Sequence, residues 1–298
     1  MRIGLFGTGY WATETWAPVL AAAEGVELAG VWGRNPQNAA ALADKVGVRP
    51  FASVEGLVAD VDAVAICLPP DVQVAVAEIA AVAGRHLLLE KPLALTLADA
   101  NRVAAAVDRS GVASVVLFTG RFLPELAAWL DAAQADGRWH GGRAVWFAAP
   151  FQPDSPYRDS VWRKHYGALW DVGPHALSFL LPVLGPVAEY PDAISAIESG
   201  GTVHLAFRHV DGASSTLSLS FSVPPAAARF EVALWGESGW SDLPKAPWSA
   251  REALQRAVLV LVEAVDAGST THPCSVNFAR DVVAVLDRVQ RALPARSE

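Results

Sequence analysis

Cysteine is scarce in this chain, and charged residues and long apolar runs are few. Two cysteines in 298 residues are too few for a disulfide framework and indicate a reducing compartment. Charged residues make up 18% of the chain and apolar residues 52%, a balance that excludes a largely disordered protein. Lysine and arginine (23) are outnumbered by aspartate and glutamate (31), and the net charge of −8 argues against a nucleic-acid partner.

The sequence also lacks the marks of an exported or membrane protein. Its first residues, Met1-Arg2-Ile3-Gly4-Leu5-Phe6-Gly7, have neither the longer apolar core nor the cleavage site of a signal peptide. No window reaches the roughly 20 apolar residues of a membrane span, and the stretch at residues 72–83 is interrupted by Gln73 and Glu78. We therefore expect a soluble, cytoplasmic protein without a membrane partner.

The first part of the chain alternates short apolar runs with longer alanine-rich segments. The runs at residues 3–6, 26–31, 61–68, 86–89 and 112–118 predict buried strands, and the segments at 15–23, 36–46, 72–83 and 96–107 have helical spacing. Repeated βα units predict a doubly wound parallel sheet, the Rossmann form of α/β fold. At roughly 150 residues per domain the length suggests two domains, and we place the dinucleotide-binding domain at residues 1–120.

The second part has strand patterns of another kind. Apolar and polar residues alternate at 203–207 and 215–223, with a hairpin turn at 210–212, and a third run follows at 230–235. Helices are predicted at 124–135, 251–266 and 276–292. This pattern predicts an α+β domain with antiparallel strands at residues 121–298, whose last helix is free to pack back on the first domain.

The motif Gly7-Thr8-Gly9-Tyr10-Trp11-Ala12 follows the first predicted strand and opens the first helix. Glycines permit a tight turn and the close approach of a pyrophosphate, and a helix N-terminus supplies unpaired N–H groups. Ala12 stands at the third glycine position, where alanine is a permitted variant. A tight strand-to-helix turn alone would also use glycine, but the place at the first βα turn favours dinucleotide binding.

Two further motifs carry ionisable side chains. Glu90-Lys91-Pro92 follows the run at 86–89, where ligands bind in such sheets, and a cis Lys91–Pro92 bond would aim Lys91 into the cofactor crevice. The motif Asp171-Val172-Gly173-Pro174-His175 puts Asp171 and His175 one turn apart on one face if the segment is helical. The alternatives are a surface lysine, an aspartate that caps the helix and a histidine of the core.

The end of the second predicted strand bears on the choice of nicotinamide. It reads Gly33-Arg34-Asn35-Pro36, without the carboxylate that holds the ribose 2′-hydroxyl in the NAD pattern. Arg34 can bind a 2′-phosphate through its guanidinium, Asn35 can donate another hydrogen bond, and Gly33 leaves room for the phosphate. We therefore expect NADP(H) to be preferred over NAD(H); the alternative is a solvated Arg34 and a pocket that accepts both.

Together these motifs resemble those of the Gfo/Idh/MocA oxidoreductases, named for glucose-fructose oxidoreductase and inositol dehydrogenase. The resemblance covers nearly the whole chain and includes Leu68-Pro69-Pro70-Asp71, Gly120-Arg121-Phe122, Val161-Trp162-Arg163 and His272-Pro273. It implies a Rossmann domain followed by a domain with a large, mostly antiparallel open sheet. It also implies hydride transfer between a nicotinamide and a hydroxyl or carbonyl carbon, usually of a sugar or polyol, in a homodimer or homotetramer formed through that sheet.

The resemblance implies a catalytic set of Lys91, Asp171 and His175, and no metal. His175 suits the acid or base role, Lys91 can stabilise a developing alkoxide or relay the proton in its place, and Asp171 would orient the other two. The expected cofactor contacts are Gly7, Thr8, Gly9, Tyr10, Trp11, Gly33, Arg34, Asn35, Leu68, Pro69, Pro70, Gln73, Glu90, Lys91 and Pro92. The expected substrate contacts are Lys91, Arg121, Trp162, Arg163, Asp171 and His175.

The chain departs from the family pattern at two positions. Gln73 stands where relatives often carry histidine, and Ser178 stands where an acidic residue often follows the D-x-G-x-H motif. Both substitutions concern the cofactor pocket or the recognition of substrate hydroxyls. Two other functions stay open: a glycosidase or lyase that uses a tightly bound nicotinamide for transient oxidation, and a catalytically silent dinucleotide-binding regulator.

Overall fold

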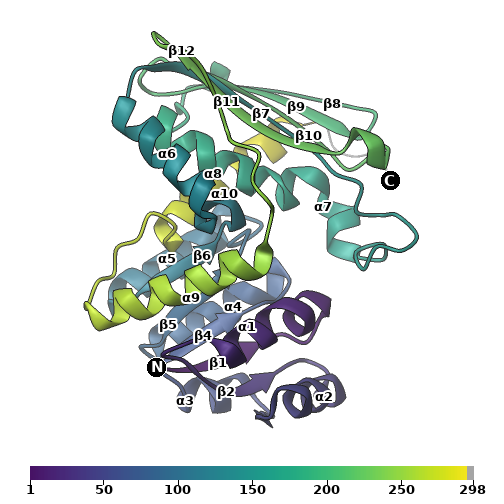
Figure 1. Ribbon diagram of the computed structural model, residues 1–298, viewed down its shortest axis with the longest axis vertical. Coiled ribbons are helices and arrows are strands. Elements are labelled where there is room, and N and C mark those ends of the chain that lie inside the picture. Colours follow the sequence, from purple (N-terminus) through teal and green to yellow (C-terminus); the bar gives the residue numbers. More distant parts are fainter. Residues whose placement is uncertain (294–298) are drawn as a thin grey trace. The chain divides into compact units, whose positions relative to one another are not determined.

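The computed structural model describes residues 1–293, which form two compact units (Figure 1). The first unit contains Met1–Leu123 and Trp248–Arg280, and the second contains Pro124–Pro247 and residues 281–293. A segment from the second half of the sequence therefore belongs to the first unit. Within residues 1–293, no helix has both the length and the apolar character that a membrane crossing requires.

The first unit is built on a six-stranded parallel sheet with the order β3-β2-β1-β4-β5-β6. Its strands are β1 (Arg2–Phe6), β2 (Glu27–Trp32), β3 (Arg49–Pro50), β4 (Ala63–Ile66), β5 (His86–Glu90) and β6 (Ser114–Leu117). Its helical segments are η1 (Ala12–Trp16), α1 (Ala17–Ala22), α2 (Pro36–Val46), α3 (Val54–Ala59), α4 (Pro70–Val82), α5 (Leu97–Ser110), η2 (Thr119–Phe122) and α9 (Ala250–Asp266). The predicted doubly wound parallel sheet is confirmed.

Local signals in the sequence set the helix ends. Asn35 accepts a hydrogen bond from the backbone N–H of Asn38 (3.0 Å) and caps α2, which begins at Pro36 as predicted. Thr96 caps α5 in the same way through the N–H of Asp99 (3.1 Å). The sequence pattern does not predict β3 and α3, which have only two and six residues and so carry too little periodicity.

The second unit contains a mostly antiparallel sheet with the order β12-β11-β7-β10-β9-β8, as the resemblance implies. Its strands are β7 (Trp139–Phe147), β8 (Ile194–Ser199), β9 (Thr202–Arg208), β10 (Ser214–Ser220), β11 (Arg229–Gly236) and β12 (Gly239–Asp242). β7 and β10 run parallel, and the other neighbours are antiparallel. The helical segments of this unit are α6 (Pro124–Asp136), α7 (Val161–Asp171), α8 (Gly173–Leu184), η3 (Pro191–Ala193) and η4 (Pro225–Ala227), and α10 (Val276–Ala292) crosses the boundary between the units.

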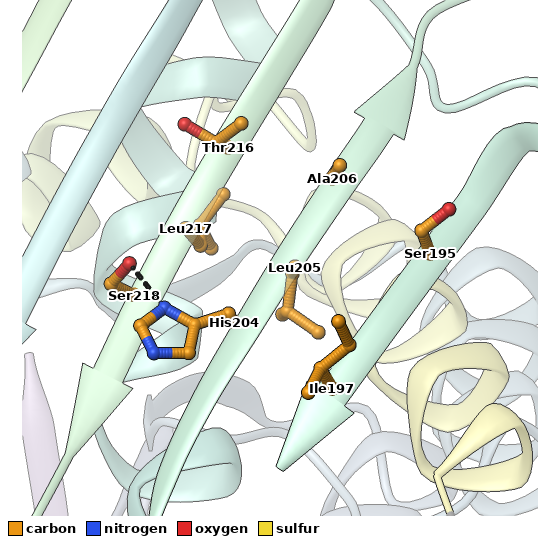
Figure 2. Close-up of a pocket in the computed structure, with 8 residues that line it drawn as sticks. All are labelled: Ser195, Ile197, His204, Leu205, Ala206, Thr216, Leu217 and Ser218. Carbon is orange, nitrogen blue, oxygen red and sulfur yellow. Dashed lines mark hydrogen bonds between the residues drawn. The ribbon is translucent and has the colours of Figure 1, made fainter. Parts of the chain in front are cut away.

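The two faces of this second sheet differ in burial. On β9, Val203, Leu205 and Phe207 are buried on the face against which α7 and α8 pack. The opposite face is exposed, and the side chains of this face in Figure 2 are those of Ser195, Ile197, His204, Ala206, Thr216 and Ser218 on β8, β9 and β10. His204 and Ser218 are joined there by a hydrogen bond of 2.9 Å, and Ile197 on the neighbouring strand is 66% exposed.

The segment at residues 248–280, which returns to the first unit, contacts the edge of its sheet. The N–H of Val116 on the edge strand β6 donates to the carbonyl of Cys274 (2.7 Å), and the N–H of Val276 donates to the hydroxyl of Ser114 (3.2 Å). Helix α9 packs on β5 and β6. An unpaired strand edge is a template for pairing with other chains, and these contacts cover it.

His272 in this segment gives the protein a testable pH dependence. Its ring stacks on that of Phe122, with the ring centres 6.0 Å apart, and its Nδ1 accepts a hydrogen bond from the N–H of Cys274 (3.0 Å). Burial, aided by the charge of Arg121, lowers the pKa of His272 from 6.5 to about 4. Because the unfolded chain takes up this proton below pH 6.5 and the folded chain does not, the free energy of unfolding falls as the pH drops from 6.5 toward 4.

We expect this loss to be smaller in His272→Asn, because an amide oxygen can accept the same hydrogen bond and does not titrate. Thermal melts of both proteins at pH 7.5 and pH 5 measure this loss of stability. The melting temperature of the parent protein should fall further between these conditions than that of the variant. Parallel shifts would show that His272 does not contribute.

Candidate functional site

The chain makes a very tight turn directly after β1. Gly7 has φ +135°, and its N–H donates to the carbonyl of Trp32 at the end of β2 (2.9 Å). A Cβ atom at Gly7 would lie 2.2 Å from the carbonyl oxygen of Cys67, so no other residue fits there. A Cβ at Gly9 would meet nothing within 4 Å. The turn therefore closes at Gly7 against Cys67, the residue after β4, and opens toward solvent at Gly9.

The helix that follows this turn begins with a π-helical stretch. In η1 the backbone hydrogen bonds join residues five apart, and the N–H of Ala17 donates to the carbonyl of Ala12. The turn and the helix start fit a dinucleotide, because Gly9 leaves open space beside N–H groups at a helix N-terminus. Residues of this turn, Gly7 to Trp11, would hold the pyrophosphate.

The end of β2 brings Gly33 against Thr8. The space that a Cβ at Gly33 would occupy is taken by the side chain of Thr8, whose Cγ2 lies 2.5 Å from that position. The absence of a side chain at Gly33 thus makes room for Thr8, and that it also makes room for a phosphate stays a prediction. Arg34 and Asn35 are exposed at this end of the strand.

The Glu90-Lys91-Pro92 turn follows β5, and the Lys91–Pro92 bond is cis as predicted. One carboxylate oxygen of Glu90 accepts hydrogen bonds from the indole Nε1 of Trp11 (2.5 Å) and of Trp16 (3.0 Å). The other oxygen accepts from the backbone N–H of Lys91 (3.2 Å). Glu90 therefore links the turn at Gly7 to Trp11, called here the dinucleotide turn for its proposed ligand, to the turn that carries Lys91.

Gln73 is fully buried behind the same turn. Its Nε2 donates to the carbonyls of Glu90 (2.9 Å), Pro92 (3.1 Å) and Leu93 (3.2 Å), and its Oε1 accepts from the N–H of Glu90 (3.1 Å). The sequence singles out Gln73 as a departure from the family pattern, but only the structure shows that its carboxamide is directed at this backbone.

The other residues expected in the first unit lie at the ends of β4 and β6. Helix α4 begins at Pro70, directly after Leu68 and the N-cap residue Pro69. Arg121 lies in η2, with its guanidinium 5.7 Å from the centre of the Phe278 ring. Contact of these residues with a cofactor or substrate stays a prediction.

In the second unit, Asp171 is paired with Arg163. The guanidinium Nε of Arg163 lies 2.7 Å from a carboxylate oxygen of Asp171, and Asp171 is only 7% exposed. The rings of Tyr157 and Trp162 flank the guanidinium, at 4.3 Å and 4.7 Å from its central carbon. Contacts with two aromatic rings and a largely buried ion pair restrain this arginine. Neither the Asp171–Arg163 pair nor Tyr157 is predicted from the sequence.

His175 lies in a different helix from Asp171. Helix α7 ends at Asp171 and α8 begins at Gly173, so the single helix considered for this segment is divided at Val172. Pro174 lies in the first turn of α8, but Val172, not Asp171, is the N-cap residue. His175 is 5% exposed, and its ring stacks on Trp146 of β7 with centres 5.0 Å apart. Ser178 donates to the carbonyl of His175 (2.7 Å).

Trp146 is a residue that the sequence reasoning misses. It lies in β7, and its ring also packs on that of Phe230 in β11, with centres 4.1 Å apart. The alternation of side chains along β7 could have indicated its place, because Trp146 shares a face with Ala144, which is fully buried.

Comparisons with known proteins agree with this fold. Residues 1–118 match the Gfo/Idh/MocA model, described as an oxidoreductase family with an NAD-binding Rossmann fold. The chain is 30% identical over 203 residues to the uncharacterized oxidoreductase ORF334 of Rhizobium meliloti, covering 66% of this chain and 60% of that protein. It is 33% identical over 158 residues to UDP-N-acetylglucosamine 3-dehydrogenase of Acidithiobacillus ferrooxidans, covering 52% and 48%. The matches thus span about half to three fifths of these relatives.

Among solved structures, GenD2 from gentamicin A biosynthesis, in complex with NAD, has the same fold over both units. The match covers 98% of this chain and 93% of that one, with a TM-score of 0.80 and 23% identity. The resemblance found in the sequence motifs is confirmed for the first unit: residues 1–118 of this chain match the model of the Gfo/Idh/MocA oxidoreductase family over its NAD-binding Rossmann fold.

Proposed function

We propose that this protein is an NAD(P)-dependent oxidoreductase that transfers a hydride between a nicotinamide and a hydroxyl or carbonyl carbon of a sugar, polyol or related small molecule. The observation that carries the proposal is the hydrogen-bonded link, through Glu90, between the dinucleotide turn and Lys91. Both turns follow strands of one parallel sheet, β1 and β5, at the edge where such sheets bind ligands. A lysine held there is suited to act beside a bound cofactor.

Lys91, Asp171 and His175 are the catalytic residues of this proposal. A bound nicotinamide supplies the hydride acceptor for oxidation and the hydride donor for reduction. His175 takes the hydroxyl proton as the C–H bond of an alcohol breaks, which leaves a carbonyl, and returns a proton in the opposite direction. Lys91 donates a hydrogen bond to the oxygen as negative charge develops on it.

Asp171 has a narrower role here than the resemblance implies. Its carboxylate is bound to Arg163, and two aromatic rings hold that arginine. A carboxylate with a fixed orientation can hold a substrate hydroxyl through its remaining lone pairs. We therefore assign Arg163 and Trp162 to the support of Asp171, alongside the contacts with substrate expected of them.

The proposed substrate is a hydroxylated small molecule. A curated relative is named as a dehydrogenase of position 3 of UDP-N-acetylglucosamine, which supports a sugar-like substrate. For the cofactor we propose NADP(H) in preference to NAD(H), because Arg34 is exposed at the end of β2, where NAD-binding chains carry a carboxylate.

A screen of polyols, aldoses and keto-sugars with both cofactors, followed at 340 nm in both directions, tests the proposed reaction. Net formation or consumption of reduced nicotinamide that depends on the added substrate is expected. Cleavage of a glycoside without net change at 340 nm would establish the glycosidase or lyase alternative instead. Cofactor binding without turnover of any substrate in the screen would favour the regulator.

We further propose that the exposed face of the second sheet meets a second subunit, giving a homodimer or homotetramer. Large apolar side chains exposed on a sheet face are typical of an interaction surface, and on this face Ile197 and Trp240 are 66% and 62% exposed. Sedimentation at micromolar concentration should give a dimer or tetramer, and Ile197→Glu should shift it toward the monomer. A monomeric parent protein would contradict the proposal.

A further inference from the structure

We propose that Gln73 is a positioning residue, whose carboxamide holds the backbone on both sides of Lys91 and so fixes the place of the lysine. The inference rests on the proposed function, in which Lys91 acts on the substrate oxygen. It gives Gln73 an indirect part in the reaction instead of a direct contact with the cofactor.

The contacts of Gln73 bracket Lys91 along the chain. The amide group binds both the N–H and the carbonyl of Glu90, the residue before Lys91. It also donates to the carbonyls of Pro92 and Leu93, the two residues after it. One side chain thus restrains the backbone before and after the lysine.

Burial makes these hydrogen bonds hard to replace. Gln73 is 0% exposed, so water does not take over the backbone groups if its amide is removed. The site needs a donor and an acceptor on one planar group, which a carboxamide supplies and an ionised carboxylate does not. Gln73 lies in the first turn of α4, and this helix packs on the strand β5. The packing of α4 on β5 therefore holds the amide in place.

Gln73→Met tests the inference, because methionine has a similar unbranched shape and cannot make these hydrogen bonds. Gln255→Met, at an exposed position of α9, is the matched control. Hydrogen exchange of the peptide spanning residues 86–95 should speed up in Gln73→Met and stay unchanged in the control. In the same variant kcat should fall by about tenfold or more, while the dissociation constant for NADPH changes by less than about threefold.

A double-mutant cycle separates positioning from general structural damage. If Gln73 acts through Lys91, then Gln73→Met should lower kcat no further in a Lys91→Ala background. Additive losses of kcat, unchanged hydrogen exchange, or a loss confined to NADPH binding would each overturn the inference. Unchanged kcat in Lys91→Ala itself would instead refute the proposed role of Lys91, whereas hydrogen exchange still reports whether Gln73 holds the turn.

Gln73→Glu serves as a second variant if Gln73→Met does not fold. A protonated carboxyl can donate one hydrogen bond and an ionised one cannot, so kcat of this variant relative to the parent should fall as the pH rises. A ratio that is independent of pH would count against the inference.

Discussion

Lys91→Ala should lower kcat by about 10²-fold or more, with a much smaller effect on the affinity for the cofactor. Glu90 and Gln73 hold the backbone of the turn in which the lysine lies. The substitution therefore removes the ammonium group and leaves the turn in place. Loss of that group removes a hydrogen bond that strengthens as charge develops on the substrate oxygen, and such a loss affects kcat more than binding. Steady-state kinetics and cofactor titration measure the two effects separately.

His175→Ala should cause a loss of similar size, because a proton acceptor is removed. His175 also stacks on Trp146, so His175→Gln, which fills more of the space, should accompany it to separate chemistry from packing. Lys245→Ala, at an exposed position outside both the proposed site and the proposed interface, provides a control whose kcat should match that of the parent. Near-normal turnover of a verified substrate by both Lys91→Ala and His175→Ala would refute the catalytic assignment.

Arg34→Ala should weaken the binding of NADPH by about 10- to 100-fold, the effect of losing a charged hydrogen bond of about 1.5–3 kcal/mol. NADH has no 2′-phosphate, so its affinity should hardly change. The parent protein is expected to bind NADPH more tightly than NADH. Titration of both reduced cofactors into both proteins gives the four dissociation constants.

Arg109→Ala, at an exposed position of α5, controls for the loss of a positive charge as such. Equal affinities of the parent for the two cofactors would show that Arg34 is a solvated residue and that the pocket accepts both. Undiminished NADPH binding by Arg34→Ala would lead to the same conclusion. Asn35 is a less informative target, because its side-chain oxygen also caps α2.

Periodicity makes the architecture of the first unit predictable. Each of its central strands is a solid apolar run, which is typical of a parallel sheet covered on both faces, and α2 begins and ends at the predicted residues. The strand β8 reads Ile-Ser-Ala-Ile-Glu-Ser and goes unpredicted, because its apolar and polar residues do not alternate strictly. The parallel pairing of β7 with β10 depends on contacts that local patterns do not encode.

The candidate site is predictable in its residues and less so in its contacts. The motifs find Lys91, Asp171 and His175, but the Arg163–Asp171 pair needs the kink at Gly167, which turns the two ends of α7 relative to each other. Gln73 is visible in the sequence only as an unusual residue. The direction of its side chain follows from the packing of α4 on β5. Such packing is a property of the tertiary structure and cannot be read from local sequence patterns.

The return of residues 248–280 to the first unit has a consequence for the order in which the protein is made. When residue 123 leaves the ribosome, β5 and β6 exist without α9, and the edge of β6 lacks the carbonyl of Cys274. At about 5–20 residues per second, the missing segment follows only after roughly ten to thirty seconds. Single domains commonly fold faster than that, so the nascent first unit carries an open apolar surface while the second unit is still being translated. The speed of translation, and not only the stability of the finished fold, therefore sets how long that surface is available to chaperones or to another chain.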